Sequence, residues 1–511
     1  MKKSNLAFFL FLSLLVFHIP SQAQKAKHLY KRGLKKEYKG NTDGAIADFT
    51  KAIQKDPNYV DPYFERAQIY SDRSQYEAAI ADYSKLIELV PDNAFNYSSR
   101  AENYRMLKQY QNAFSDYSKA FEIDPRDVTS LFYRGYCNYK LNNYKESIPD
   151  FNKAIALDST DKDYFFYRGL AFDYLDEDTA AIADFTKVIS LKSDDEEAYV
   201  DRGNLYVTLK DYEKGLVDLS KAIELDQTDA MAYRSRGICN RHLKKYDAAI
   251  SDYNKAIQLE PDNQDNYFDR GICWDDMENY QNAVSDYTKA IEMNPDYAGS
   301  YLNRGNAYDD MKDYEKAMAD YNKAIALNPK FTLAFYNRGM CNIDLKKFDD
   351  GLQDLNKAIE LDPQDADAYF ERGICWEGKN DYVNAFADYT QAIQINPQEE
   401  KAYVNLGNVF DHEKDYKNAM VNYNKAIALD PNDSLGYYNR GICYRAQGKY
   451  DLSIPDFTKT IELNAKDEKA YYYRGCSYFE LHQSAKACDD WQKAQELGDA
   501  EATEKIREHC K

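Results

Sequence analysis

The chain has 511 residues, 30% of them charged, and its formal net charge at pH 7 is −20. So acidic a protein repels phosphate backbones and anionic lipid, which argues against nucleic acid as a partner. Length alone would predict three or four globular domains of roughly 150 residues each, but the repeats described below predict one extended array instead.

Residues Met1–Ala23 have the pattern of a secretory signal. Lys2 and Lys3 precede the apolar stretch Leu6–Ile19, and the small residue Ala23 offers a cleavage site. The apolar stretch is short for a bilayer span, which favours cleavage over the alternative of an uncleaved membrane anchor. We therefore expect an exported protein, periplasmic or secreted, with no transmembrane span after the signal is removed.

From Ala26 to Glu501 a 34-residue pattern recurs fourteen times without insertion or deletion. It is clearest in Ala298–Phe331, where Ala298 is position 1. Position 8 is Gly or Ala, position 20 is Ala, Gly or Ser, and aromatic residues favour positions 4, 11 and 24. The spacings 4–8–11 and 20–24–27 are helical, so each set lines one face of a helix. Small residues let the two helices approach closely, and the aromatic rings fill the remaining space.

The flanking residues predict where these helices begin and end. Asp or Asn stands at position 34 in nine repeats and would cap the following helix. Pro stands at position 32 in nine repeats and would end the second helix. We expect the first helix to span positions 2–14 and the second to span positions 18–31.

This pattern resembles the tetratricopeptide repeat family, a helix–turn–helix of 34 residues, in an exported bacterial type. The resemblance covers nearly all of the mature chain. It implies an all-α fold, a right-handed α-solenoid of fourteen units that is continuous over residues 26–501, with residues 502–511 as a C-terminal cap. One departure is Arg at position 7 in thirteen repeats, where the family usually has Leu.

The occurrence of Arg at position 7 correlates with the occurrence of Asp at position 23. Position 23 is Asp in thirteen repeats, and the twelfth repeat breaks both rules, with Leu406 and Asn422. This coincidence predicts a partly buried Arg–Asp ion pair within each repeat, because an arginine beside the core needs a partner. The alternatives are two separately solvated side chains, or pairing between repeats. The representative pairs are Arg304–Asp320 and Arg270–Asp286.

A second helical stripe, positions 2, 5, 9, 12 and 13, lies opposite positions 4, 8 and 11. We expect this stripe not to pack within its own repeat. In the resembling family the corresponding face lines a concave groove that binds ligands, so the aromatic residues at position 5 are candidate partner-binding residues. The alternative is that their rings pack laterally against neighbouring first helices. The candidates are Phe64, Phe132, Phe166, Phe268, Tyr336, Phe370 and Tyr438.

Carboxylates lie near the rim of the same stripe in repeats 8–12. They would favour a basic partner, and the alternative is a solvated face of an acidic protein. The carboxylate-clamp pattern of chaperone-binding members of the resembling family needs basic groove residues, and position 5 is basic only at Arg234. That mode of binding is therefore not expected. The candidate acidic residues are Asp275, Asp276, Asp309, Asp310 and Asp344.

Nine cysteines occur in the chain. Six occupy position 10, and equivalent points on successive helices should lie about 10 Å apart, whereas a disulfide needs Cα atoms within about 7 Å. We therefore expect these six to be small apolar fillers. Cys476, Cys488 and Cys510 lie outside this register, and a disulfide among them is left open. The six are Cys137, Cys239, Cys273, Cys341, Cys375 and Cys443.

No catalytic motif, metal-ligand spacing or cofactor motif appears in the sequence. The sequence therefore predicts a non-enzymatic scaffold, monomeric and without cofactor or metal, that binds a protein or peptide in a concave groove. The alternative is a glycan-binding envelope protein that uses the aromatic stripe as a sugar platform.

Overall fold

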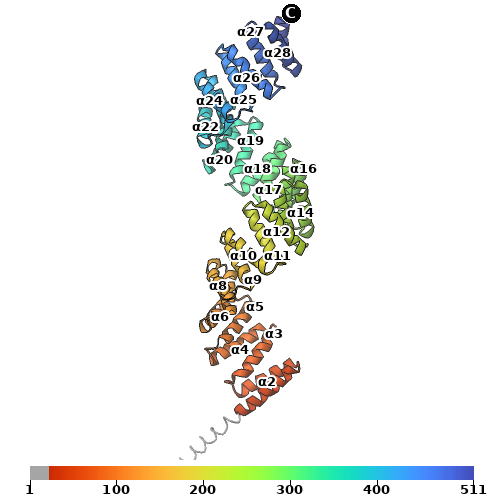
Figure 1. Cartoon of the computed structure of the whole chain (residues 1–511), viewed down its shortest axis with the longest axis vertical. Helices are drawn as coiled ribbons and strands as arrows, with labels where there is room; N and C mark the ends of the chain where they lie inside the picture. The colour runs from red at the N-terminus through yellow and green to blue at the C-terminus, as the bar shows by residue number, and fades with distance from the viewer. Residues whose placement is uncertain (1–21, 511) are drawn as a thin grey trace, which may run out of the picture. The chain divides into compact units, whose positions relative to one another are not determined.

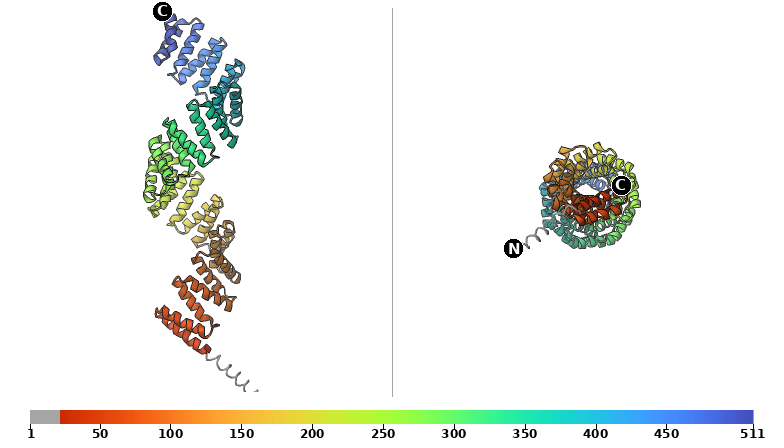
Figure 2. Two further views of the ribbon diagram at one scale, coloured as in Figure 1. Left: turned by 180° about the vertical axis from the view of Figure 1, so that it is seen from behind. Right: turned by 90° about the horizontal axis from the view of Figure 1, so that it is seen from below.

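A computed structural model describes residues 22–510, so most of the predicted signal lies outside the described residues. Contacts between residues divide the chain into two compact units, unit 1 (Met1–Pro261) and unit 2 (Asp262–Lys511). The boundary falls in the turn between the seventh and eighth repeats. Figures 1 and 2 show that each unit is built of successive helix pairs, each stacked on the next.

The first described helix of unit 1 covers residues 22–38. The helices that follow it are α2 (Thr42–Lys55), α3 (Val60–Asp72), α4 (Tyr76–Leu89), α5 (Ala94–Met106), α6 (Tyr110–Ile123), α7 (Val128–Lys140), α8 (Tyr144–Leu157), α9 (Lys162–Asp173), α10 (Asp178–Leu191), α11 (Glu196–Thr208), α12 (Tyr212–Leu225), α13 (Ala230–His242) and α14 (Tyr246–Leu259).

Unit 2 continues the same alternation and ends with one additional helix. Its helices are α15 (Gln264–Asp276), α16 (Tyr280–Met293), α17 (Ala298–Asp310), α18 (Tyr314–Leu327), α19 (Thr332–Asp344), α20 (Phe348–Leu361), α21 (Ala366–Gly378), α22 (Tyr382–Ile395), α23 (Glu400–His412), α24 (Tyr416–Leu429), α25 (Ser434–Ala446), α26 (Tyr450–Leu463), α27 (Glu468–Glu480), α28 (Ser484–Leu497) and α29 (Ala500–His509).

Residues 22–510 contain no strand, so the predicted all-α architecture of helix–turn–helix units is confirmed within each unit. None of the helices in this described range combines the length and the apolar character that a membrane crossing would require.

Both helices of a typical repeat begin and end one residue earlier than the sequence predicts. The reason is the turn between them, where position 15 takes a left-handed backbone conformation, as at Lys312 with φ 63°. The N–H of Asp313 then donates to the carbonyl of Tyr308 at 2.8 Å, which closes the first helix at position 13. The predicted caps at position 34 are present, for example at Asp365, whose carboxylate accepts from the N–H groups of Asp367 and Ala368.

The core of each repeat lies where its two helices cross. A Cβ atom on Gly305 would stand 2.7 Å from Cε1 of Tyr321, a ring that is 1% exposed, so position 8 must stay small. Between repeats, the small residue at position 20 meets the cysteine of the next repeat, as Gly351 meets Cys375. All six cysteines at position 10 are buried and none of them forms a disulfide, which confirms their role as fillers.

The last helix, α29, packs on α28 and contains most of the predicted C-terminal cap. Ala502 is fully buried, and Ile506 packs against the cluster around Trp491. Cys488 on α28 forms a disulfide with Cys510, and their Cα atoms lie 5.6 Å apart. Cys476, the third cysteine outside the register, is buried and free.

Candidate functional site

The arginines at position 7 form ion pairs within their own repeats. Nε and Nη2 of Arg304 donate to the two carboxylate oxygens of Asp320, each at 2.8 Å. Arg270 donates in the same way to Asp286, at 2.7 and 2.6 Å. Thirteen such pairs occur among residues 22–510, and repeat 12, with Leu406, is the exception, as the sequence pattern predicts.

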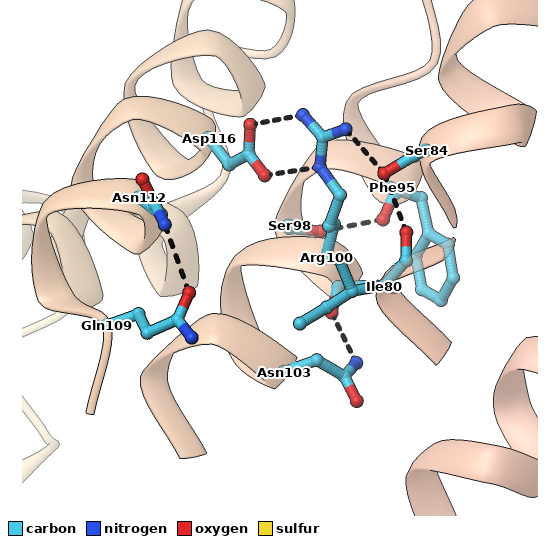
Figure 3. A network of polar contacts seen from close by, with 10 residues as sticks. Ile80, Ser84, Phe95, Ser98, Arg100, Asn103, Gln109, Asn112 and Asp116 are labelled. Carbon is cyan, nitrogen blue, oxygen red and sulfur yellow. Dashed lines mark hydrogen bonds and ion pairs between the residues drawn. The ribbon is translucent and has the colours of Figure 1, made fainter. Parts of the chain in front are cut away.

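Most of these arginines also bind the preceding repeat, a contact that the sequence analysis missed. Figure 3 shows the Arg100 guanidinium between the Asp116 carboxylate and the Ser84 hydroxyl, to which Nη1 donates at 3.0 Å. Arg304 contacts Thr288 at the same distance. The sequence pattern could have predicted this contact, because position 25 is Ser, Thr or Asn in thirteen repeats. The arginine is therefore a structural link between three helices.

The aromatic residues at position 5 pack in two directions. Within the repeat, their rings lie over the ring at position 24, and the centroid distances are 5.9 Å for Phe132–Phe151 and 5.8 Å for Phe166–Phe185. Three of the remaining candidates make the same contact: Phe268 with Tyr287, Phe370 with Tyr389, and Tyr438 with Phe457. The expectation that this stripe does not pack in its own repeat is wrong, because a ring at position 5 is long enough to reach the second helix.

Toward the next repeat, Phe132 lies 4.9 Å from Tyr164 and Phe64 lies 5.7 Å from Phe95. Phe132 and Phe166 are buried, whereas the other candidates are half-buried. Burial also raises the pKa of Tyr336. These rings therefore contribute to the packing between repeats, and a binding role for them stays a prediction.

The acidic candidates fall into two groups. Asp275 and Asp309, at position 12, are half-buried, and Tyr287 donates its hydroxyl hydrogen to Asp275 at 2.9 Å. Burial raises the pKa of Asp275 to about 6 and also raises the pKa of Asp309. Asp276, Asp310 and Asp344, at position 13, are exposed. Only this second group fits the solvated face that was the alternative interpretation.

A hollow of about 260 Å³ opens on the first helices of repeats 2–4, in unit 1. Position 5 of repeat 3 is Ser98 instead of an aromatic residue, and the missing ring leaves space between neighbouring helices. We name this hollow the serine pocket. It is lined by Ser71, Ser98, Ser99, Glu102, Asn103 and Tyr133, among others.

Asn103, one of the residues that line the serine pocket, has an unsatisfied acceptor. Asn103 is 1% exposed, and its Nδ2 donates to the Ser99 carbonyl at 2.8 Å. Its Oδ1 is buried and accepts no hydrogen bond from the described residues. Such an atom is costly to leave unpaired.

Glu102 contributes to the serine pocket a carboxylate that is paired with Arg105. It accepts from the Tyr117 hydroxyl at 2.9 Å and from Arg105 Nε at 2.8 Å. Burial opposes its ionisation, but the contacts with Arg105 and Tyr117 outweigh burial and lower the pKa of Glu102. The carboxylate is therefore ionised at neutral pH.

A second hollow, of about 330 Å³, lies farther along the first helices of unit 1. We name it the carboxylate pocket. The residues that line it include Phe166, Leu170, Glu196, Val200, Asp201 and Asp229. Burial, together with nearby carboxylates, raises the pKa values of both Glu196 and Asp201 to about 7.

Among residues 22–510 no group of three or more His, Cys, Asp or Glu side chains is arranged to hold a metal ion. Both hollows are lined by polar and charged side chains.

Family models described as tetratricopeptide repeat match nine stretches of the chain, which together cover more than half of it. The matched residues are 49–81, 128–161, 196–229, 230–263, 265–297, 298–331, 332–365, 400–433 and 434–467.

Solved structures show further similarity. The APC/C hetero-tetramer Cut9–Hcn1 is 13% identical, covering 89% of this chain and 96% of that chain, with a TM-score of 0.42. Yeast Tom70 is 18% identical, and the match covers 80% of this chain and 93% of Tom70, with a TM-score of 0.37. A tetratricopeptide repeat protein of Parabacteroides merdae is 19% identical, and the match covers 46% of this chain and 93% of that protein, with a TM-score of 0.39. The comparison with curated proteins gave no match.

Proposed function

Because the chain belongs to the tetratricopeptide repeat family, we propose that it is a non-enzymatic protein–protein interaction scaffold that holds an extended polypeptide against the first helices of its repeats. The observation that carries this proposal is the serine pocket, which joins side chains of three successive repeats. A polypeptide has backbone N–H groups that need acceptors when they leave water. The hydroxyl groups of Ser98 and Ser99, which line the pocket, can act as such acceptors.

Aromatic rings continue this surface toward the carboxylate pocket. Tyr133 lines the serine pocket, Tyr167 lines the carboxylate pocket, and Tyr136 lies between them, 6.3 Å from Tyr133 and 5.0 Å from Tyr167. Tyrosine offers apolar area together with a hydroxyl group, which suits a polypeptide with mixed side chains. The glycan-binding alternative draws less support, because the position 5 rings that would form its platform lie against other rings.

We also propose that the protein is exported, loses residues 1–23, and acts as a monomer with one continuous solenoid. The disulfide between Cys488 and Cys510 supports an oxidising compartment. Mass spectrometry of the purified protein should find Gln24 as its first residue, and sedimentation should give the mass of one chain. A retained N-terminus or a tight dimer would contradict these two claims.

The scaffold function is tested by selecting a random 12-residue peptide phage library on the purified chain, beside a glycan array. We expect enriched peptides and an array without signal. Thr129 is exposed and lines the serine pocket. Thr129→Arg should weaken the enriched peptides at least tenfold, whereas the matched control Thr179→Arg, exposed on α10, should not. Glycan signal without peptide enrichment would favour the alternative.

A further inference from the structure

We infer that the carboxylate pocket of unit 1 binds a lysine or arginine side chain of the partner polypeptide. This inference rests on the proposed scaffold function and adds the class of residue that the surface selects.

The carboxylate pocket has the two chemical parts that a long basic side chain requires. Its apolar wall is formed by Phe166 and Val200, which are 8% and 6% exposed, and by Leu170. Such a wall can cover the methylene groups of a lysine or arginine stem. The same pocket is lined by Glu196 and Asp201, whose oxygens can accept from an ammonium or a guanidinium group.

One pair in this pocket lacks a cation that the preceding repeat has. In repeat 5, position 1 is Lys162, and its ammonium lies 2.9 Å from Asp195 at position 34. In repeat 6 the same two positions are Glu196 and Asp229, so two carboxyl groups meet where an ion pair would otherwise form.

In this pair of carboxyl groups, one oxygen of Glu196, the buried Oε1, has no hydrogen-bond partner among the described residues. Burial, followed by the contact with Asp229, raises the pKa of Glu196 to about 7. Asp201 has its pKa raised similarly, by burial and then by the charges of Asp173 and Glu197. An incoming cation would relieve this repulsion.

Two lysines lie beside the pocket, and within residues 22–510 neither forms an ion pair with Glu196 or Asp201. Lys140 also lines the pocket, but its ammonium lies 5.3 Å from the ring centroids of both Tyr136 and Tyr139. Lys162 is held by Asp163 and Asp195. The surplus of carboxylates in the pocket therefore selects a positive group from outside the chain.

The substitution Glu196→Lys tests this inference, because it copies the pair that Lys162 and Asp195 form one repeat earlier. The new ammonium would occupy the place of the ligand's cation without disturbing the fold. Asp201→Asn removes one charge at almost constant shape. Glu213→Lys, on the exposed side of α12, changes the net charge by the same amount as Glu196→Lys and is the matched control.

The probes are the most enriched phage peptide and a copy in which its lysine becomes norleucine or its arginine becomes citrulline. Fluorescence anisotropy should show that the neutral copy binds the wild-type chain at least tenfold more weakly. Glu196→Lys should weaken the parent peptide equally, and should leave the affinity of the neutral copy unchanged. Asp201→Asn should weaken the parent peptide severalfold, and Glu213→Lys should do so less than twofold. Thermal melts should show that Glu196→Lys is no less stable than the wild type.

The failures are distinguishable. If peptides are enriched but contain no basic residue, or bind the Glu196→Lys and Glu213→Lys variants alike, this inference is overturned and the scaffold function stands. If no peptide is enriched, the scaffold function and the inference are both overturned.

Discussion

Arg304 links three helices through one guanidinium group. It pairs with Asp320 on α18 and donates to Thr288 on α16, while its own backbone belongs to α17. Its side chain is 18% exposed and that of Asp320 is 8% exposed. At such burial an ion pair matters mainly because either partner left alone would be a buried, unpaired charge.

We therefore expect Arg304→Leu to destabilise repeat 9 by about 3 kcal/mol, because it strands the Asp320 carboxylate. The double variant Arg304→Leu with Asp320→Asn should recover most of this loss, since repeat 12 has the same two residues, Leu406 and Asn422. Hydrogen exchange of the amides in α17 and α18 measures the local stability directly. Equal losses in the single and double variants would contradict this account.

Raised carboxyl pKa values make stability depend on pH. Asp201 and Glu371 each have a pKa of about 7, caused first by burial and then by nearby carboxylates. In the unfolded chain these groups titrate near pH 4. Between these values the folded state binds more protons, so this contribution to stability is present at low pH and is lost as the pH rises toward 7.

The melting temperature should accordingly be higher at pH 5.5 than at pH 8. Asp201→Asn should raise the melting temperature more at pH 8 than at pH 5.5, because it removes the charge that faces Asp173, Asp195, Glu197 and Asp229. A larger gain at pH 5.5 would show that the sign is wrong.

At the scale of helices, the packing of first helices against their neighbours depends on the rings at position 5. Phe132 is 7% exposed and contacts rings on α8 and α9. Phe132→Ala should cost about 3–5 kcal/mol, as the truncation of a buried phenylalanine does. Tyr38→Ala, at a ring that is 94% exposed, should change stability by less than about 0.5 kcal/mol. Urea unfolding followed by circular dichroism compares the two, and similar midpoints would refute the packing role.

The terminal helix α29 is fastened to α28 by the disulfide between Cys488 and Cys510, which lie 22 residues apart. A loop of that size corresponds to about 3 kcal/mol of stabilisation. Cys510→Ser should increase hydrogen exchange in α29 and expose it to trypsin at Arg507. Dithiothreitol should produce the same effect in the wild-type chain and no further effect in the variant. If dithiothreitol changes neither hydrogen exchange nor trypsin cleavage in α29 of the wild-type chain, the disulfide does not hold α29 in place.

For the whole molecule, charge is the dominant property. A net charge of −20 opposes the folded state through self-repulsion, and salt screens this repulsion. Raising NaCl from about 10 to 150 mM shortens the Debye length from about 30 to 8 Å. We expect the melting temperature to rise over this range. A fall would mean that the exposed ion pairs, which salt weakens, outweigh the repulsion.

The repeat itself could be derived from the amino-acid sequence. The 34-residue period, the small residue at position 8 against the ring at position 24, and the pairing of Arg304 with Asp320 all follow from helical spacing. They recur in nearly every repeat, so each copy reinforces the same interpretation. The cysteines at position 10 were understood in the same way, because their distance from one another depends only on the distance between stacked helices.

Other features required the tertiary structure. Asp275 and Asp276 are neighbours in sequence, but only the packed helices make one half-buried and the other exposed. Lys312 takes a left-handed backbone conformation because a helix ends there, and a lysine in the sequence does not predict that conformation. The hollows beside Asn103 and Asp201 are lined by side chains from several repeats, and they depend on how completely those side chains fill the space between helices. A period describes what the repeats share, whereas a pocket arises where one repeat differs from its neighbours in three dimensions.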